Sequence, residues 1–305
     1  MLALEIVRLP SSRGPSLAMI HLSLGMLEAR IAPLAGGSIA SFSAAGQDML
    51  RPLPVADEHD PMAMACHPLV PFSGRIAWGR FTFEGRTVTL PPDPIALPHA
   101  IHGLGWRHPW EVTRSDAQEA MLAFRHPGGD WPWAFEARQH FVLDETALTV
   151  TLALINRSET RMPAALGLHP FFPSRHSARL TARLPFMWDM TSDLMPARRI
   201  DVPEGLDFAR GRDLAPLSLD DCFAGNDGAL LIEWSDRRHA LHITRPGAAD
   251  TIIYTPREHD FFCVEPSTHV PNGFNLDGPP EITGLRVLEP GEETRLACRF
   301  EVLWR

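Results

Sequence analysis

The chain contains no lysine. Its 305 residues include 28 basic residues of the Lys/Arg type, and every one of them is an arginine. A Schiff-base mechanism requires a lysine amine, and so does the phosphate-binding P-loop. Both are therefore excluded, and chemistry at a carbonyl carbon would have to proceed by general acid–base catalysis.

Long apolar runs are also lacking. No stretch approaches the roughly 20 apolar residues that are needed to span a membrane, so we expect no membrane partner. Near the N-terminus, Glu5, Arg8 and Arg13 interrupt the apolar residues before the hydrophobic region of a secretory signal peptide could form. The sequence therefore predicts a cytoplasmic protein.

Cysteine is scarce and scattered. The four cysteines show no CxxC or other spacing typical of a metal site, so we interpret them as reduced, mostly buried thiols. They are Cys66, Cys222, Cys263 and Cys298.

The charge balance argues against a nucleic-acid partner. The net charge is -9 and the isoelectric point is about 5.8, whereas proteins that bind nucleic acids need a basic face. A hydrophobic content of 45% with 21% charged residues is typical of a soluble globular protein. Because no linker, low-complexity tract or repeat is visible, we expect a single domain over residues 1–305.

The periodicity of the chain is that of β-strands. Residues 147–156 alternate apolar and polar positions, and residues 285–304 and 81–90 each read as a hairpin, the latter turning at Glu84–Gly85. The 29 prolines and 22 glycines leave little room for long helices. Further strands are expected at 136–144, 228–234, 239–245, 251–255 and 260–265.

These strands, spaced by about 8 to 12 residues, predict an all-β protein built as a large antiparallel sandwich or barrel. Residues 173–220 are rich in Pro, Arg and Asp. We expect that segment to be a long connection of irregular structure.

Four short segments combine polar groups with turns and aromatic residues. They centre on Arg75 in CHPLVPFSGRIAWGR, His102 and Trp106 in PHAIHGLGWRHPW, His169 in LGLHPFFP, and Glu265 in DFFCVEPSTH. The histidines, Arg75 and Glu265 each have a commoner structural interpretation when taken alone, such as a core histidine, a surface arginine or a glutamate capped by a backbone amide. Trp106 could equally stack on a sugar or belong to the core. A carboxyl group that ends an apolar strand is nevertheless suited to act as a general base, because burial raises its pKa.

Metal and nucleophile motifs are missing. His99 and His102 are three residues apart, but no HExxH motif accompanies them, and in an extended chain they point to opposite faces. The sequence therefore predicts no metal site. It also contains no GxSxG motif, and no GxGxxG follows a strand, so serine hydrolase and dinucleotide-binding functions are disfavoured.

In this order and spacing, the segments resemble the aldose 1-epimerase (galactose mutarotase) family. The family pattern is matched by Arg75 in SGRI, His102 in HAIHG, His169 in LGLHPFF, Asp220 in LDDCF and Glu265 in CVEP. The resemblance covers roughly residues 20–304. It implies an all-β supersandwich fold, a monosaccharide substrate and no cofactor.

Two positions depart from the family pattern. The asparagine that usually precedes the arginine is Gly74 here, and a glycine that follows the first histidine is Leu104. Asp221 also stands next to Asp220, which we prefer because Phe223 then keeps the D-x-x-F spacing. These departures leave the preferred sugar open more than the reaction.

The resemblance implies interconversion of the α and β anomers of a free aldose. Glu265 would act as the base and His169 as the acid, while Arg75, His102 and Asp220 would bind the sugar. Trp106 is a further candidate, to cover an apolar face of the sugar. A hexose-6-phosphate 1-epimerase, with arginines such as Arg107 at the phosphate, is an alternative. A non-catalytic carbohydrate-binding protein of the same fold is another.

Overall fold

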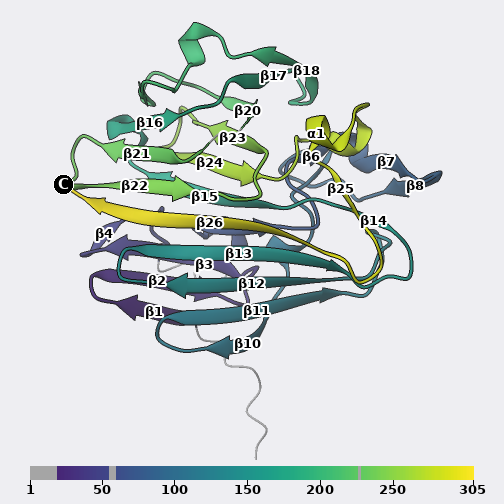
Figure 1. Cartoon of the computed structure of the whole chain (residues 1–305), viewed down its shortest axis with the longest axis horizontal. Helices are drawn as coiled ribbons and strands as arrows, with labels where there is room; N and C mark the ends of the chain where they lie inside the picture. Colours follow the sequence, from purple (N-terminus) through teal and green to yellow (C-terminus); the bar gives the residue numbers. More distant parts are fainter. Residues whose placement is uncertain (1–18, 55–59, 226–227) are drawn as a thin grey trace, which may run out of the picture.

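The computed structural model describes residues 19–54, 60–225 and 228–305. The N-terminal residues that predict the absence of a signal peptide lie outside these ranges. Two large antiparallel sheets dominate the fold, and in Figure 1 the nine-stranded sheet lies in front of strands of the eleven-stranded sheet. Side chains from both sheets belong to one hydrophobic cluster. The expectation of one domain stays a prediction.

The eleven-stranded sheet has the order β1-β2-β3-β5-β15-β24-β23-β20-β17-β18, with β4 paired to β3. Its strands are β1 (Ile20–Leu24), β2 (Leu27–Ala32), β3 (Ser38–Ala44), β4 (Gln47–Asp48), β5 (Cys66–Leu69), β15 (Gly167–Pro173), β17 (Phe186–Met190), β18 (Pro196–Asp201), β20 (Asp220–Ala224), β23 (Asp250–Tyr254) and β24 (Phe261–Ser267).

The nine-stranded sheet has the order β10-β11-β12-β13-β26-β22-β21-β16-β19. Its strands are β10 (Glu111–Ser115), β11 (Glu119–His126), β12 (Phe135–Leu143), β13 (Ala147–Asn156), β16 (Ala178–Ala182), β19 (Arg212–Asp213), β21 (Leu230–Trp234), β22 (His239–Thr244) and β26 (Glu293–Trp304).

Three small two-stranded sheets and several short helical turns complete the described chain. The small sheets pair β6 (Arg75–Ile76) with β9 (Ala100–Ile101), β7 (Arg80–Phe83) with β8 (Arg86–Thr89), and β14 (Met162–Ala164) with β25 (Arg286–Leu288). The 3-10 turns are η2 (Pro61–Ala63), η3 (Ala77–Gly79), η4 (Gly105–Arg107), η5 (Arg175–Ser177), η6 (Glu204–Leu206) and η7 (Gly273–Asn275), and the α-helix described is α1 (Pro280–Thr283).

The all-β prediction is confirmed, with two local corrections. β13 begins and ends at the predicted residues, and β7 and β8 form the predicted hairpin around Glu84–Gly85. The hairpin predicted over 285–304 is wrong, because β25 pairs with β14 while β26 pairs with β13 and β22. The segment 173–220 is also more regular than predicted, since it contributes β16 to β19 to the two sheets.

The strand alternation shows how the sequence builds the core. Along β26, Leu296, Cys298 and Phe300 are buried within the large hydrophobic cluster, whereas Ala297 and Arg299 between them are partly exposed. This period of two is what places one face of a strand against the facing sheet. All four cysteines are buried and free, as the sequence predicts.

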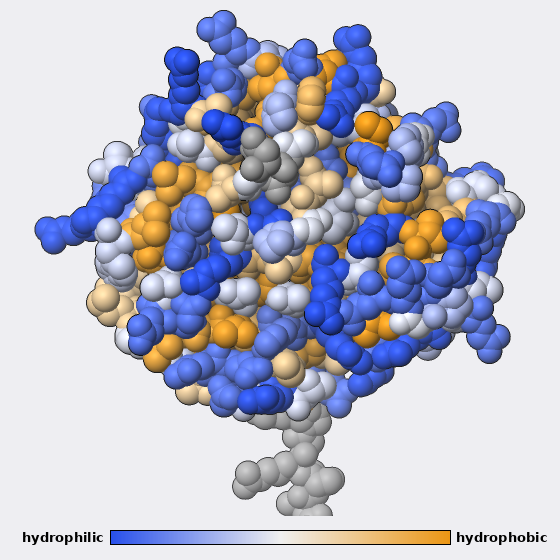
Figure 2. Space-filling model, viewed as in Figure 1, coloured by the Kyte–Doolittle hydropathy of each residue, from blue (hydrophilic) through white to orange (hydrophobic). Residues whose placement is uncertain are grey.

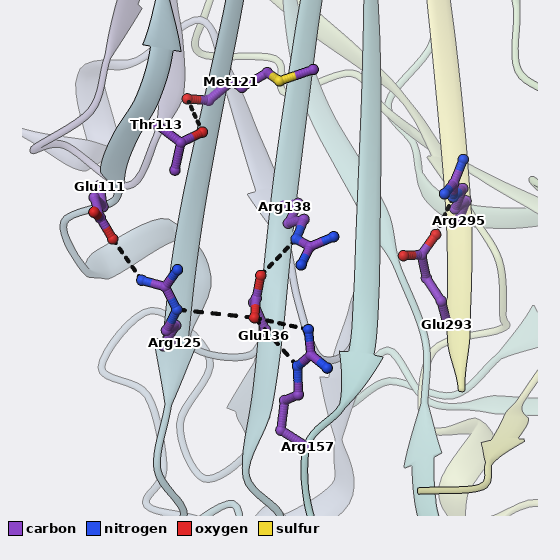
Figure 3. Close-up of polar contacts among 9 residues, drawn as sticks. All are labelled: Glu111, Thr113, Met121, Arg125, Glu136, Arg138, Arg157, Glu293 and Arg295. Carbon is purple, nitrogen blue, oxygen red and sulfur yellow. Dashed lines mark hydrogen bonds and ion pairs between the residues drawn. The ribbon is translucent and has the colours of Figure 1, made fainter. Parts of the chain in front are cut away.

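The outer face of the nine-stranded sheet carries paired charges. On it, the Glu136 carboxylate lies 2.6 Å from Arg138 Nε, 3.1 Å from an Arg157 nitrogen and 3.9 Å from Arg125 Nε (Figure 3). The face of the molecule drawn in Figure 2, which is also the view of Figure 1, is largely hydrophilic, with small hydrophobic patches between the charged side chains. Many of the arginines are thus used in ion pairs on the surface.

No helix among the described residues is both long enough and apolar enough to cross a membrane.

Candidate active site

The site is built on one face of the eleven-stranded sheet. In β15 and β24, Gly167 lies opposite Ser267 and Phe171 opposite Cys263, a register that places His169 opposite Glu265. Because side chains alternate along a strand, these residues share one face. Adjacent strands therefore bring together two residues that are 96 positions apart in the sequence (265 − 169 = 96).

His169 and Glu265 form a close pair. His169 Nε2 lies 3.4 Å from Glu265 Oε1, and the two side chains are only 13% and 5% exposed. Burial, together with the nearby Arg51 cation, lowers the pKa of His169 to about 3. Burial and the Asp220 carboxylate raise the pKa of Glu265 well above its usual range, while Arg75 opposes that shift.

Each shift favours the uncharged form of its group, so together they favour a pair that carries one exchangeable proton. In the free site, the directions of the two shifts put that proton on Glu265. A Glu265 carboxylate acting as base requires the proton on His169 instead. The two arrangements differ by the transfer of one proton between atoms that are 3.4 Å apart. The pair can therefore supply one acid and one base from a single proton.

His102 faces the same site from the loop after β9. Its backbone has a positive φ of 61°, which is unusual for a residue with a side chain. The N–H of Gly74 donates to Nδ1 of His102 at 3.2 Å, and the His102 N–H donates to the Gly74 carbonyl at 3.0 Å. Because Nδ1 accepts, the proton of the neutral imidazole lies on Nε2, which is then available as a donor.

The structure explains why glycine stands at position 74. Gly74 has φ 65°, and a Cβ at this position would lie 2.9 Å from the Cβ of Pro271. An asparagine would therefore collide with a rigid ring. The second departure, Leu104, has φ −112° and ψ −34°, so this backbone position does not need a glycine.

A loop after β24 holds the segment that carries Arg75. His269 Nε2 accepts the Ser73 N–H at 3.0 Å, and Asn272 Oδ1 accepts the Ala77 N–H at 2.9 Å. The Asn272 N–H in turn donates to the Arg75 carbonyl at 2.7 Å. These three bonds fix the backbone on both sides of the Arg75 side chain.

Arg75 and Asp220 form an ion pair in the wall of the cavity. Arg75 lies 3.7 Å from an Asp220 oxygen, and both side chains are partly exposed. Burial raises the pKa of Asp220, while Arg75 opposes the shift. Asp221 also lines the cavity, but among the described residues it is Asp220 that pairs with Arg75.

The cavity that these residues line has a volume of about 440 Å³, within the range of sites for small molecules. Charged and polar side chains line it together with apolar ones. The lining residues are Arg51, Met62, Gly74, Arg75, Ile95, Ile101, His102, His169, Phe171, Met190, Leu194, Asp220, Asp221, Cys222, Ile252, Tyr254, His259, Phe261, Glu265 and Pro271.

Trp106 is placed differently from the other five predicted site residues. It is 2% exposed and does not line the cavity. Its ring lies 5.5 Å from that of His67 and 6.4 Å from that of His102, with the Arg107 guanidinium 3.9 Å above it. Trp106 therefore packs behind the histidines, where it can hold them in position.

Several cavity residues escaped the sequence interpretation. The Phe171 ring stacks on His169 at 4.4 Å, and the Arg51 guanidinium lies 3.9 Å above the Phe171 ring. Phe261 is a second ring under Arg51, at 5.0 Å. The alternation of 261, 263 and 265 along one strand is the signal that could have placed Phe261 and Cys263 on the face of Glu265.

One group of metal-binding side chains occurs in the described part of the chain. His169, Cys263 and Glu265 each offer one ligand atom, and these atoms all lie within 4.8 Å of one another. The sequence predicted no metal site because its argument rested on the spacing of histidines and cysteines along the chain. These three side chains come from two adjacent strands, β15 and β24, so their spacing along the chain does not reveal that they lie together.

The comparisons with known proteins decide the family. The family model described as Aldose 1-epimerase matches residues 20–301. The chain belongs to the aldose 1-epimerase family. The chain is also 30% identical over 249 residues to the uncharacterized protein YphB of Escherichia coli (strain K12), an alignment that spans 79% of this chain and 84% of YphB.

Solved structures support the fold of this aldose 1-epimerase family member. A crystal structure from Escherichia coli K12, of a protein provisionally named an aldose 1-epimerase, has a TM-score of 0.86 at 28% identity and covers 94% of this chain and 99% of its own. A galactose mutarotase-like protein from Clostridium acetobutylicum has a TM-score of 0.83 at 20% identity, with 93% and 95% covered. The predicted galactose mutarotase-like sandwich is confirmed.

Proposed function

We propose that this protein is an aldose 1-epimerase that interconverts the α and β anomers of a free, unphosphorylated aldose. The observation that carries the proposal is the pair of His169 and Glu265, whose facing atoms are 3.4 Å apart in the wall of a cavity of sugar size. A carbohydrate-binding site without turnover would need no acid–base pair. The cytoplasmic location expected from the sequence is part of the proposal.

Ring opening needs a base at the anomeric hydroxyl and an acid at the ring oxygen, the two oxygen atoms bonded to C1. Glu265 removes the proton from the anomeric hydroxyl, the C1–O1 bond becomes a carbonyl, and the C1–O5 bond breaks. His169 delivers a proton to O5. Rotation about the C1–C2 bond then presents the other face of the carbonyl. In ring closure the two residues exchange roles, and the pair returns to its starting protonation state.

The other groups hold the sugar for these transfers. His102 donates from Nε2 to the ring oxygen or to a neighbouring hydroxyl, because its Nδ1 is occupied by the Gly74 N–H. Arg75 and Asp220, partly exposed and paired at 3.7 Å, offer a donor and an acceptor to sugar hydroxyls. Fixing the substrate in this way makes the proton transfers effectively intramolecular.

The charges of the cavity favour a sugar without a phosphate. The carboxylates of Asp220 and Asp221 line it and would oppose a phosphate. Its two arginines are already engaged, Arg75 with Asp220 and Arg51 with the carbonyl groups of Met62 and Met64. Arg107, a candidate for phosphate binding from the sequence, does not line the cavity. Its guanidinium donates to both Asp93 oxygens at 2.9 Å.

A panel of sugars tests the proposal. We would measure anomeric exchange by NMR with glucose, galactose and glucose 6-phosphate, each with and without the protein. We expect exchange of a free aldose to accelerate in proportion to protein concentration, with glucose 6-phosphate accelerated less. Acceleration restricted to glucose 6-phosphate would support the phosphate-specific alternative, and no acceleration with any aldose would support a binding protein.

A further inference from the structure

Cys263 has no role in the proposed reaction, yet it lies on the same strand face as Glu265. The two residues are separated by one position in β24, and Tyr254 of β23 and Phe171 of β15 flank Cys263 in the register. Cys263 is fully buried. Its sulfur, a ring nitrogen of His169 and a carboxylate oxygen of Glu265 all lie within 4.8 Å of one another.

The geometry matches the needs of a tetrahedral metal ion. Zinc binds His nitrogen and carboxylate oxygen at about 2.0–2.2 Å, so two such ligands at a tetrahedral angle are separated by about 3.4 Å. His169 Nε2 and Glu265 Oε1 lie 3.4 Å apart. The Cys263 sulfur lies within 4.8 Å of both atoms, and it would have to approach them to about 3.6 Å to complete a tetrahedral site.

The chemistry of the three ligands selects the class of ion. A thiolate, an imidazole and a carboxylate together suit zinc and related thiophilic cations, whereas magnesium and calcium prefer sites made only of oxygen ligands. With both Cys263 and Glu265 ionised and His169 neutral, the two negative charges balance a divalent cation. A neutral cluster is what a buried site tolerates best.

We propose that His169, Cys263 and Glu265 form a binding site for a thiophilic divalent cation such as Zn²⁺. The ion would have three protein ligands and a fourth position that faces the cavity, from which it enters. This site goes beyond the proposed reaction, which uses no metal. On the proposed function, the bound ion occupies both members of the acid–base pair, so it acts as a reversible inhibitor that competes with the sugar.

Direct binding is the first test, and it does not depend on catalysis. We would titrate the metal-free protein with Zn²⁺ by equilibrium dialysis and with Co²⁺ by absorption, which reports a thiolate ligand through a charge-transfer band in the near ultraviolet. We expect one ion per chain and a thiolate band. The absence of that band at saturating Co²⁺ would overturn the proposal.

Two matched variants assign the sulfur. Cys222 is also buried, belongs to the same sheet and lines the cavity, but it lies outside the ligand group. Cys263→Ser should lose the band and weaken Zn²⁺ binding by at least about tenfold, since even outer contacts of a metal site are worth that much. Cys222→Ser should keep both. Equal loss in the two variants, or none in Cys263→Ser, would contradict the assignment.

The inhibition test separates this inference from the proposed function. Each variant is compared with its own metal-free rate of anomeric exchange, in Zn²⁺, in Mg²⁺ and after a chelator is added. We expect Zn²⁺ to inhibit the wild type reversibly, Mg²⁺ to have no effect, and Cys263→Ser to need at least about tenfold more Zn²⁺. A protein that binds Zn²⁺ through Cys263 but never accelerates exchange would refute only the proposed function. An active protein without Zn²⁺ binding would refute only the metal site.

Discussion

His169 and Glu265 stand opposite each other on neighbouring strands, with His169 Nε2 3.4 Å from Glu265 Oε1. Burial acts on the two groups in opposite directions, because it disfavours the charged form of each. It lowers the pKa of His169 and raises that of Glu265. The pair is thereby set to exchange a single proton with a substrate over a wide range of pH.

This arrangement predicts a bell-shaped pH profile of kcat/KM with a broad plateau. Below the pKa of His169, lowered to about 3, the pair takes up a second proton and has no base left. Above the raised pKa of Glu265, the pair loses its only proton and has no acid left. Measurements in a series of buffers should therefore find activity retained down to pH values far below 6.5. An acid limb at the ordinary pKa of histidine would contradict the assignment.

The two adjacent aspartates should differ in effect. Asp220 pairs with Arg75, and a hydrogen bond to a charged group is worth about 1.5–3 kcal/mol, so Asp220→Asn should lower kcat/KM roughly ten- to hundredfold. Asp221→Asn is the matched control and should change kcat/KM by only a few-fold. Steady-state kinetics with both variants would contradict this if Asp221→Asn were the more damaging.

The same variant has a second consequence, for the pH profile. The Asp220 carboxylate helps to raise the pKa of Glu265. Asp220→Asn removes that negative charge, so the alkaline limb of kcat/KM should move to lower pH. An unchanged alkaline limb would mean that this limb does not report Glu265.

Trp106 packs behind His102 and His67 rather than against the cavity. Trp106→Phe keeps an aromatic ring there, and the buried Nε1 that it removes has no hydrogen-bond partner. We therefore expect KM for the sugar to change by less than about threefold, with some loss of thermal stability from the smaller ring. A large rise in KM with unchanged stability would instead support contact between Trp106 and the sugar.

Gly74 should tolerate no side chain. Gly74→Ala forces a Cβ against Pro271 at a positive φ. We expect it to lower the free energy of unfolding by about 1–3 kcal/mol. We also expect a lower kcat/KM, because the backbone of residue 74 holds His102 through two hydrogen bonds. Gly46→Ala is the control, since Gly46 also has a positive φ but open space around it. Denaturant unfolding should show the larger loss for Gly74→Ala. Equal losses would mean that the Pro271 contact has no part in the effect.

Local pattern predicted much of this molecule. Period-two alternation located β13 and the β7–β8 hairpin, and the order of short motifs led to the family. Local alternation could not predict which strands pair when they are far apart in the sequence. β25 looked like one arm of a hairpin, but it pairs with β14, which lies more than 120 residues earlier.

The same limit applies to the site. Five of the six predicted site residues line the cavity, whereas Trp106 does not. A buried tryptophan and a sugar-covering tryptophan have the same local sequence, so only packing distinguishes them. Arg51 belongs to no motif and lies outside the strands, and the bond from its N–H to the Phe171 carbonyl, at 2.7 Å, holds its backbone beside β15. Cys263 lies in the segment of Glu265, but its closeness to His169 depends on the pairing of β24 with β15.

Glu265→Gln, assayed by polarimetry with the free aldose that the wild type uses best, tests the central claim most directly. Glutamine keeps the size of the side chain and cannot accept the proton, and general acid–base catalysis contributes about 10²–10⁴-fold. With Glu145→Gln, a change at an exposed turn, as the control, we predict a loss of kcat by at least that factor with sugar binding largely retained. A Glu265→Gln protein with kcat near that of the wild type would contradict the account.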